Sequence, residues 1–277
     1  MSASLYADKV GAEICSPYFD ASGVLHVLSQ ATGDVLAVGP SSEVTVAFNA
    51  GGQPSGAALS PGSGALYLAD LAHSAVLSVD DLPSGKQSVV VRVYEDKAFK
   101  GPNSLAFDNA DNLYFTDSGA LGETGLHAPR GSLYYISNGI GGQMLRPLAL
   151  ECLAHPCGVA VSPDGRAVYV AEMMLNRVLR FVQRPAGVFH CSVFAQLSGG
   201  VGPSALACDS SGALYIGHYE LAETGARGRI TVLGADGRQL SEISVPAPEI
   251  TGLCLTPDQR ALVITEASSG SVYSVTI

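Results

Sequence analysis

A single sequence unit recurs along the whole chain. Its clearest copy is GPNSLAFDNADNLYFTD, from Gly101 to Asp117, in which two short runs of apolar, aromatic and β-branched residues flank a turn rich in Asp and Asn. This pattern is typical of a β-hairpin. The other copies are QPSGAALSPGSGALYLAD, HPCGVAVSPDGRAVYVAE, GPSALACDSSGALYIGH, EITGLCLTPDQRALVITE and a weaker one, ICSPYFDASGVLHVLS.

The spacing of the copies indicates the architecture. The period lies between 40 and 54 residues, because the six copies begin near Ile14, Pro54, Pro102, Pro156, Pro203 and Ile250. One blade of a β-propeller, a four-stranded sheet with its loops, needs about that length. We therefore predict an all-β, six-bladed β-propeller that occupies residues 1–277 as a single domain. The absence of Trp excludes the WD signature of one common propeller class.

The ends of the chain predict how the ring closes. The last copy is followed by only one further strand before Ile277, and residues 4–13 precede the first copy without a blade of their own. An open ring would expose sheet edges. We expect residues 5–10 to form the outer strand of the last blade.

Charge and hydropathy narrow the classes of partner. The net charge is −10, and the chain holds only 15 Lys and Arg residues, whereas nucleic acids and anionic membranes bind clustered basic residues. We expect neither nucleic acid nor a membrane as a partner. No apolar run approaches the roughly 20 residues of a membrane span, and the first residues lack the features of a signal peptide. A cytoplasmic protein is therefore expected.

Aligning the copies gives one residue per blade at the start of the innermost strand. We call this set the axial column: Cys15, Ser55, Asn103, Cys157, Ser204 and Thr251. Because the innermost strands of a propeller surround its axis, these side chains are expected to converge there and to bind a ligand.

A second set, the exit column, follows the next strand of each blade. It is strongly acidic and comprises Ser29, Asp70, Asp117, Glu172, His218 and Glu266. Carboxylates at strand ends commonly accept hydrogen bonds from neighbouring backbone N–H groups, so a structural role is one interpretation. The alternative is a ligand-binding role for Asp117 and a catalytic role for Glu172, Glu266 and His218.

Two loops after these strands share Leu-x-Glu-Thr-Gly followed by Arg. They span residues 118–131 and 219–228 and should overhang the open end of the axis. Their charged residues are further candidates for ligand binding: Glu123, Arg130, Glu223 and Arg227.

PNSLAFDNADNLYFTD and HPCGVAVSPDGRAVYVAEMMLNRVLRF resemble the superfamily that contains gluconolactonase, senescence marker protein and the strictosidine synthase-like proteins. The resemblance covers the whole chain. In the lactonase members it implies a divalent cation, usually calcium, held in the axial column by a Glu, by Asn residues and by an Asp. Only Asn103 matches that set, since Cys15, Cys157 and Ser204 stand at the other ligand positions.

This difference leaves three interpretations of function. In the first, the metal site is degenerate, no cofactor is bound, and the mouth of the channel binds a small molecule or a protein. In the second, the protein hydrolyses lactones or esters with calcium or another divalent cation near Asn103, and Glu123 or Glu223 replaces the missing acids. In the third, it is a metal-free strictosidine synthase-like enzyme that uses Glu172 or Glu266. A zinc site formed by Cys15, Cys157 and His218 is a further alternative, because thiolate and imidazole are zinc ligands.

Overall fold

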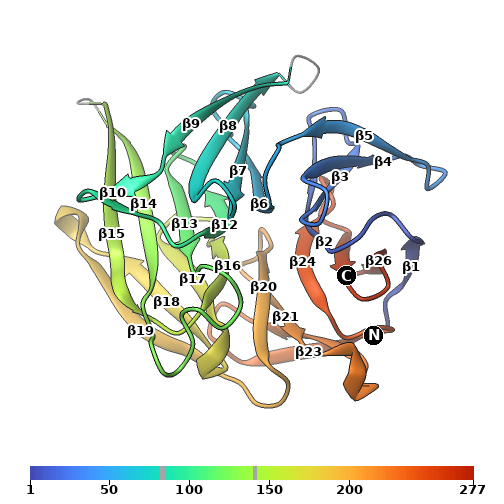
Figure 1. Cartoon of the computed structure of the whole chain (residues 1–277). Helices are drawn as coiled ribbons and strands as arrows, with labels where there is room; N and C mark the ends of the chain where they lie inside the picture. Colours follow the sequence, from blue (N-terminus) through green and yellow to red (C-terminus); the bar gives the residue numbers. More distant parts are fainter. Residues whose placement is uncertain (82–84, 140–141) are drawn as a thin grey trace.

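In the computed structural model, which describes residues 1–81, 85–139 and 142–277, the strands surround a central axis as six four-stranded antiparallel sheets (Figure 1). We number them as blades 1 to 6. Blade 1 contains β2 (Ile14–Phe19), β3 (Leu25–Ser29), β4 (Asp34–Val38) and β5 (Val44–Asn49). Blade 2 contains β6 (Pro54–Leu59), β7 (Leu66–Asp70), β8 (Ala75–Asp81) and β9 (Lys86–Val91). Blade 3 contains β12 (Pro102–Phe107), β13 (Leu113–Asp117), β14 (Gly131–Gly139) and β15 (Gly142–Leu153).

Blades 4 to 6 follow the same plan. Blade 4 contains β16 (Pro156–Val161), β17 (Ala167–Glu172), β18 (Arg177–Gln183) and β19 (Phe189–Gln196). Blade 5 contains β20 (Gly202–Cys208), β21 (Leu214–Tyr219), β22 (Gly228–Leu233) and β23 (Gln239–Val245). Blade 6 contains β24 (Ile250–Leu255), β25 (Ala261–Glu266), β26 (Ser271–Thr276) and β1 (Ser4–Ala7). A small hairpin, β10 (Val93–Tyr94) and β11 (Lys97–Ala98), and three single-turn 3₁₀ helices, Met173–Leu175, Pro185–Gly187 and Ala222–Thr224, lie in the connections.

The innermost strands form a closed ring. Each of β2, β6, β12, β16, β20 and β24 contacts the next, and β24 contacts β2. The predicted six-bladed β-propeller is therefore confirmed. Among the described residues, no helix is long and apolar enough to cross a membrane.

Blade 6 is completed by the N-terminal strand, as predicted. β1 pairs antiparallel with β26, with Ser4 opposite Ser274 and Leu5 opposite Tyr273, and the two ends of the chain lie beside this blade (Figure 1). The strand begins one residue before the predicted start and ends at Ala7 rather than near Val10. Val10 instead packs in an apolar cluster with Ile14.

Small residues let the inner strands approach one another. A Cβ atom on Gly158 would lie 2.9 Å from the Ser204 carbonyl oxygen, and one on Gly252 would lie 2.6 Å from the Ser16 nitrogen. Both neighbouring atoms belong to the backbone of the next blade, which cannot move aside as a flexible side chain can. Glycine is required where two backbones pass this closely.

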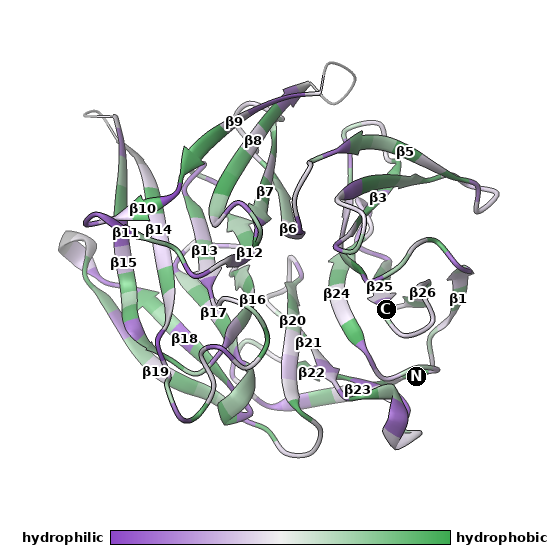
Figure 2. Cartoon of the chain, in the orientation of Figure 1, coloured by the Kyte–Doolittle hydropathy of each residue, from purple (hydrophilic) through white to green (hydrophobic). Residues whose placement is uncertain are grey.

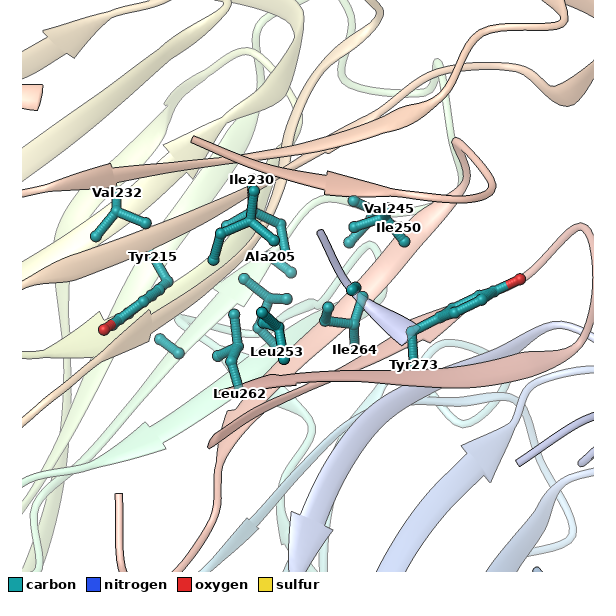
Figure 3. Packing of buried hydrophobic residues seen from close by; sticks show 14 of the residues in the cluster. Ala205, Tyr215, Ile230, Val232, Val245, Ile250, Leu253, Leu262, Ile264 and Tyr273 are labelled. Atoms are coloured by element: carbon teal, nitrogen blue, oxygen red, sulfur yellow. The ribbon is translucent and has the colours of Figure 1, made fainter. Parts of the chain in front are cut away.

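The core lies between neighbouring blades. Tyr215, Ile230 and Val232 of blade 5 pack in one cluster with Leu262 and Ile264 of blade 6 (Figure 3). Hydrophobic stretches run along the strands of the blades (Figure 2). The second strand of blade 4, β17, is buried along its whole length, whereas the outer strand β9 of blade 2 is mostly exposed, as expected when a sheet packs on both faces but ends in solvent at its outer strand. Each blade therefore depends on its neighbours for burial.

Deleting residues 1–7 should destabilise the whole ring, because β26 would become an exposed edge. We expect the melting temperature to fall by roughly 10 °C, since 1 kcal/mol corresponds to a few degrees in a domain of this size, and aggregation to increase. A synthetic peptide of residues 1–10, added in excess, should restore part of the loss. An unchanged melting curve for the shortened chain would contradict the closing role of β1.

Candidate functional site

The axial column converges on one pocket. A cavity of about 380 Å³ opens at the end of the axis where the innermost strands begin, and all six side chains of the column line it. A smaller cavity of about 80 Å³ lies further along the axis and shares four of them: Ser55, Asn103, Ser204 and Thr251. The convergence expected from the aligned copies is therefore present.

The hydroxyl groups of this column bind the neighbouring blade. Ser55 Oγ donates to the Pro102 carbonyl oxygen at 2.9 Å, and Ser204 Oγ donates to the Ile250 carbonyl oxygen at 2.6 Å. In each pair the acceptor belongs to the next blade around the ring. Thr251 Oγ1 does the same across the point of closure, where it donates to the carbonyl oxygen of Ile14 in blade 1 at 2.6 Å.

Asn103 and the two cysteines complete the column. Cys15 Sγ lies 3.5 Å from the Ser55 carbonyl oxygen of the next blade, whereas Cys157 Sγ contacts the His155 carbonyl oxygen of its own blade at 3.5 Å. Asn103 Nδ2 donates to Ser118 Oγ at 3.2 Å. Asn103 Oδ1 forms no hydrogen bond within the described part of the chain, so it is free to bind a ligand.

The acidic exit column anchors the loop that leads into the innermost strand of the same blade. Asp117 accepts from the Gly101 N–H at 2.7 Å, Glu172 from the Ala154 N–H at 2.8 Å, and Glu266 from the Glu249 N–H at 3.0 Å. Burial raises the pKa of Asp117, and the two backbone N–H groups that it accepts from oppose that shift. This geometry matches the structural interpretation of the column.

None of the three predicted catalytic residues lines the axial pocket. Glu172 and Glu266 are fully buried, and Glu172 also accepts a hydrogen bond from Arg177 Nε at 2.5 Å. His218 Nε2 lies 2.9 Å from Thr231 Oγ1, and its Nδ1 lies 3.2 Å from an Arg229 nitrogen. Burial and that guanidinium lower the pKa of His218 to about 4.

The charged residues of the two loops do not line the pocket either. Glu123, Arg130, Glu223 and Arg227 are all exposed, and Glu123 Oε2 accepts a hydrogen bond within its own loop, from the Ala120 N–H at 3.2 Å. The loops do reach the mouth, but through Leu121 and through Tyr219, the last residue of β21. The expectation that Glu123 or Glu223 stands in for a missing ligand acid is not matched by this arrangement.

The pocket contains functional groups that the sequence reasoning missed. Glu13, His155 and Glu249 line it, and each lies two residues before an axial-column residue. Glu13 and His155 both have a positive φ, of 48° and 54°, so the chain turns just before the innermost strand, and this upstream column faces the pocket beside the axial column. The signal was the same alignment of copies, shifted by two positions.

The pocket is acidic and its histidine is neutral. Two carboxylates, Glu13 and Glu249, line it, and no Lys or Arg does among the described residues. Burial, and then the nearby Glu249 carboxylate, raise the pKa of Tyr219 to about 12. Burial lowers the pKa of His155 to about 4, and its Nδ1 is buried without a hydrogen-bond partner in the described structure.

The donor set of the axial column does not fit the calcium ion that the family resemblance implies. Calcium prefers six to eight oxygen ligands with several carboxylates, whereas this ring offers one amide, three hydroxyls and two thiols. Burial raises the pKa of both Cys15 and Cys157 to about 12, so both thiols stay neutral.

The predicted zinc set is not brought together, because His218 lies outside the pocket that holds the two cysteines. Across residues 1–81, 85–139 and 142–277, no three His, Cys, Asp or Glu side chains form a group that could hold a metal ion.

His155 should make the fold sensitive to acid. Its pKa is about 4 in the folded chain against 6.5 when exposed, so between these values the unfolded state binds more protons. The stability from this residue is complete above pH 6.5 and is lost as the pH falls toward 4, by about 3 kcal/mol at most. His155→Asn keeps a residue tolerated at its positive φ of 54° and should reduce the loss measured by urea unfolding at pH 7 and pH 4.5.

The matched control for this measurement is His127→Asn, in the exposed part of the loop at residues 118–131. It should leave the pH dependence as in the parent protein. His218 is present in the parent and in both variants and titrates in the same pH range. The difference in acid-induced loss of stability between the parent and His155→Asn therefore reports on His155 alone. Equal acid sensitivity of His155→Asn and the parent would contradict the assignment.

Known proteins share this architecture and part of the sequence. A lactonase, drp35, of Staphylococcus saprophyticus is 27% identical over 251 residues, which are 87% of this chain and 72% of that protein, whereas the alignments to several other staphylococcal proteins of the same name cover 42% of their length. A gluconolactonase from Xanthomonas campestris superposes with a TM-score of 0.81 at 21% identity, over 97% of this chain and 87% of that one.

A calcium-binding protein, regucalcin, from Agrobacterium tumefaciens has the same fold. It superposes with a TM-score of 0.80 at 18% identity, over 100% of this chain and 94% of that one. The family model described as the SMP-30/gluconolactonase/LRE-like region matches residues 17–268, which include all six innermost strands except the first residues of β2. The chain therefore belongs to the SMP-30/gluconolactonase/LRE-like family.

Proposed function

We propose that this protein binds a small molecule in the axial pocket without a calcium ion in the axial column. The observation that carries the proposal is that the side chains of the axial column already interact with the protein itself. Three of its hydroxyl groups donate to the backbone of the next blade, and its two thiols are held neutral by burial. Residues at the positions of family metal ligands thus join blades or fill space.

The pocket keeps the properties of a ligand site although the metal ligands have changed. Its volume of about 380 Å³ lies within the range of small-molecule sites. It combines carboxylate, amide, phenol and imidazole groups with the apolar side chains of Leu121 and Met173. A rigid ring of blades preorganises these groups, which lowers the cost of binding.

Titration with calcium, followed by thermal unfolding, tests the absence of the metal. A cation at about 100 times its dissociation constant would add about 2.7 kcal/mol, which raises the melting temperature by roughly 5 °C or more. We expect millimolar calcium to leave the melting temperature of the parent protein unchanged. A calcium-dependent rise that Asn103→Ala abolishes would overturn the proposal.

A gain-of-function variant serves as the matched control for this titration. Cys15→Glu, Cys157→Asn and Ser204→Asp together restore the ligand types that the family resemblance places at these positions, beside the existing Asn103. This triple variant should gain a calcium-dependent rise in melting temperature. The single variant Cys15→Glu leaves the set incomplete, so it should show a much smaller response.

Hydrolysis of a lactone or ester is the second candidate function. It is supported by the lactonase of Staphylococcus saprophyticus, to which this chain aligns over 72% of that protein, and by the free Oδ1 of Asn103 at the pocket. A divalent cation would bind there, with Glu13 or Glu249 as the anionic partners that the axial column lacks. Under this function, a panel of lactones with added calcium, magnesium or zinc should give turnover that Asn103→Ala lowers by about tenfold or more. Absence of turnover with every cation would reject it.

A further inference from the structure

The axial pocket has two chemically different sides. Blades 5, 6 and 1, which are consecutive in the ring, contribute Tyr219, Glu249, Glu13 and Gln30. Blades 3 and 4 lie across the axis from blade 6 and blade 1, and they contribute Leu121 and Met173 together with the uncharged polar side chains of Asn103 and His155. A ligand that spans the pocket therefore meets anionic groups at one end and uncharged, partly apolar groups at the other.

The charges of the acidic side are not neutralised by the chain. Neither Glu13 nor Glu249 forms an ion pair within the described residues, whose ion pairs all involve other carboxylates. Glu249 accepts hydrogen bonds from neutral groups, namely the Ala222 N–H at 3.1 Å and the Tyr219 hydroxyl. Both carboxylates contribute to the raised pKa of Tyr219, Glu249 more than Glu13, so the two charges act on the same part of the mouth.

The apolar side continues onto the rim of the mouth. Leu121 lines the pocket although 57% of its surface is exposed. Leu126, in the same loop, is also exposed, at 64%. An exposed apolar side chain that lines a pocket can contact the apolar body of a ligand.

An unsatisfied polar group inside the pocket also points to a ligand. His155 is only 3% exposed, lines the cavity, and has a buried Nδ1 with no partner among the described residues. Buried polar groups without a partner are rare and usually have a functional reason. The neutral ring adds no positive charge to the site, so it does not oppose a cation.

We infer that the ligand is a hydrophobic organic cation, such as an alkyl or aryl amine. Its ammonium group lies beside Glu13 and Glu249, and its apolar body lies against Leu121 and Met173. This inference rests on the proposed small-molecule binding and names its chemical class. The net charge of −10 favours the approach of a cation over long distances as well.

A series of probes with one hydrocarbon chain and different head groups tests the class. Hexylammonium, 1-hexanol and hexanoate are titrated into the full chain by calorimetry, with methylammonium as the probe without an apolar body. Hexylammonium should bind about tenfold more tightly than hexanol, and hexanoate should be weakest, because the combined attraction of half-buried Glu249 and exposed Glu13 is worth about 1.4 kcal/mol. Higher salt should weaken hexylammonium binding only.

Three variants assign the preference to residues. Glu13→Gln with Glu249→Gln should reduce the preference for hexylammonium over hexanol to less than about threefold. Glu223→Gln removes an exposed carboxylate that does not line the pocket and should keep the full preference. Leu121→Ser should weaken hexylammonium and hexanol alike and leave the preference between them intact.

The outcomes separate this inference from the proposed function. Equal binding of hexanol and hexylammonium in the parent, or an unchanged preference after the double Glu→Gln exchange, would overturn the cationic class and leave small-molecule binding in place. Binding of none of the four probes would also overturn the class, while the calcium titration tests the metal-free part of the proposed function independently. A parent-like melting temperature of each variant confirms that the fold is intact.

Discussion

The close packing of six innermost strands around one axis is the constraint on which the rest of the structure depends. Backbones approach so closely that glycine is needed at Gly158 and Gly252, and the hydroxyls of Ser55, Ser204 and Thr251 donate to carbonyl groups of the next blade. Side chains at this radius therefore serve two purposes at once, since they both close the ring and line its opening. A residue that joins blades there is less available to bind a ligand.

The acidic exit column affects the pocket through the backbone. Glu266 binds the N–H of Glu249, and Glu172 binds the N–H of Ala154, next to His155. These carboxylates are buried one layer away from the cavity, yet they fix the position of residues that line it. The exit column thus holds the upstream column, and the upstream column supplies the charge of the mouth. Loss of a buried carboxylate would be expected to disturb ligand binding without that carboxylate touching the ligand.

The sequence predicted the fold and part of the site for a physical reason. Repeats of one hairpin report the blade number, and the unpaired third strand of the last copy indicates closure by β1. Aligned copies also place Asn103 and its counterparts on the axis, because equivalent residues of equivalent blades lie at the same radius. Loop side chains have no such constraint, which is why Glu123 and Glu223 were expected at a pocket that only Leu121 and Tyr219 reach from those loops. The aligned copies place His155 two residues before Cys157, but its burial and the missing hydrogen bond of its Nδ1, which make it distinctive, are features of the folded chain alone.

The side chains that stand where the family resemblance implies metal ligands are coherent as a set. A lone carboxylate left in the axial column without a cation would carry an uncompensated charge in a confined space, which costs free energy. At Cys15 and Ser204 the side chains are instead neutral and contact the next blade. The negative charge of the pocket instead comes from the upstream column, at Glu13 and Glu249, each of which lies two residues before an axial-column residue. The ring thereby combines an uncharged axis, whose side chains join the blades, with an acidic mouth.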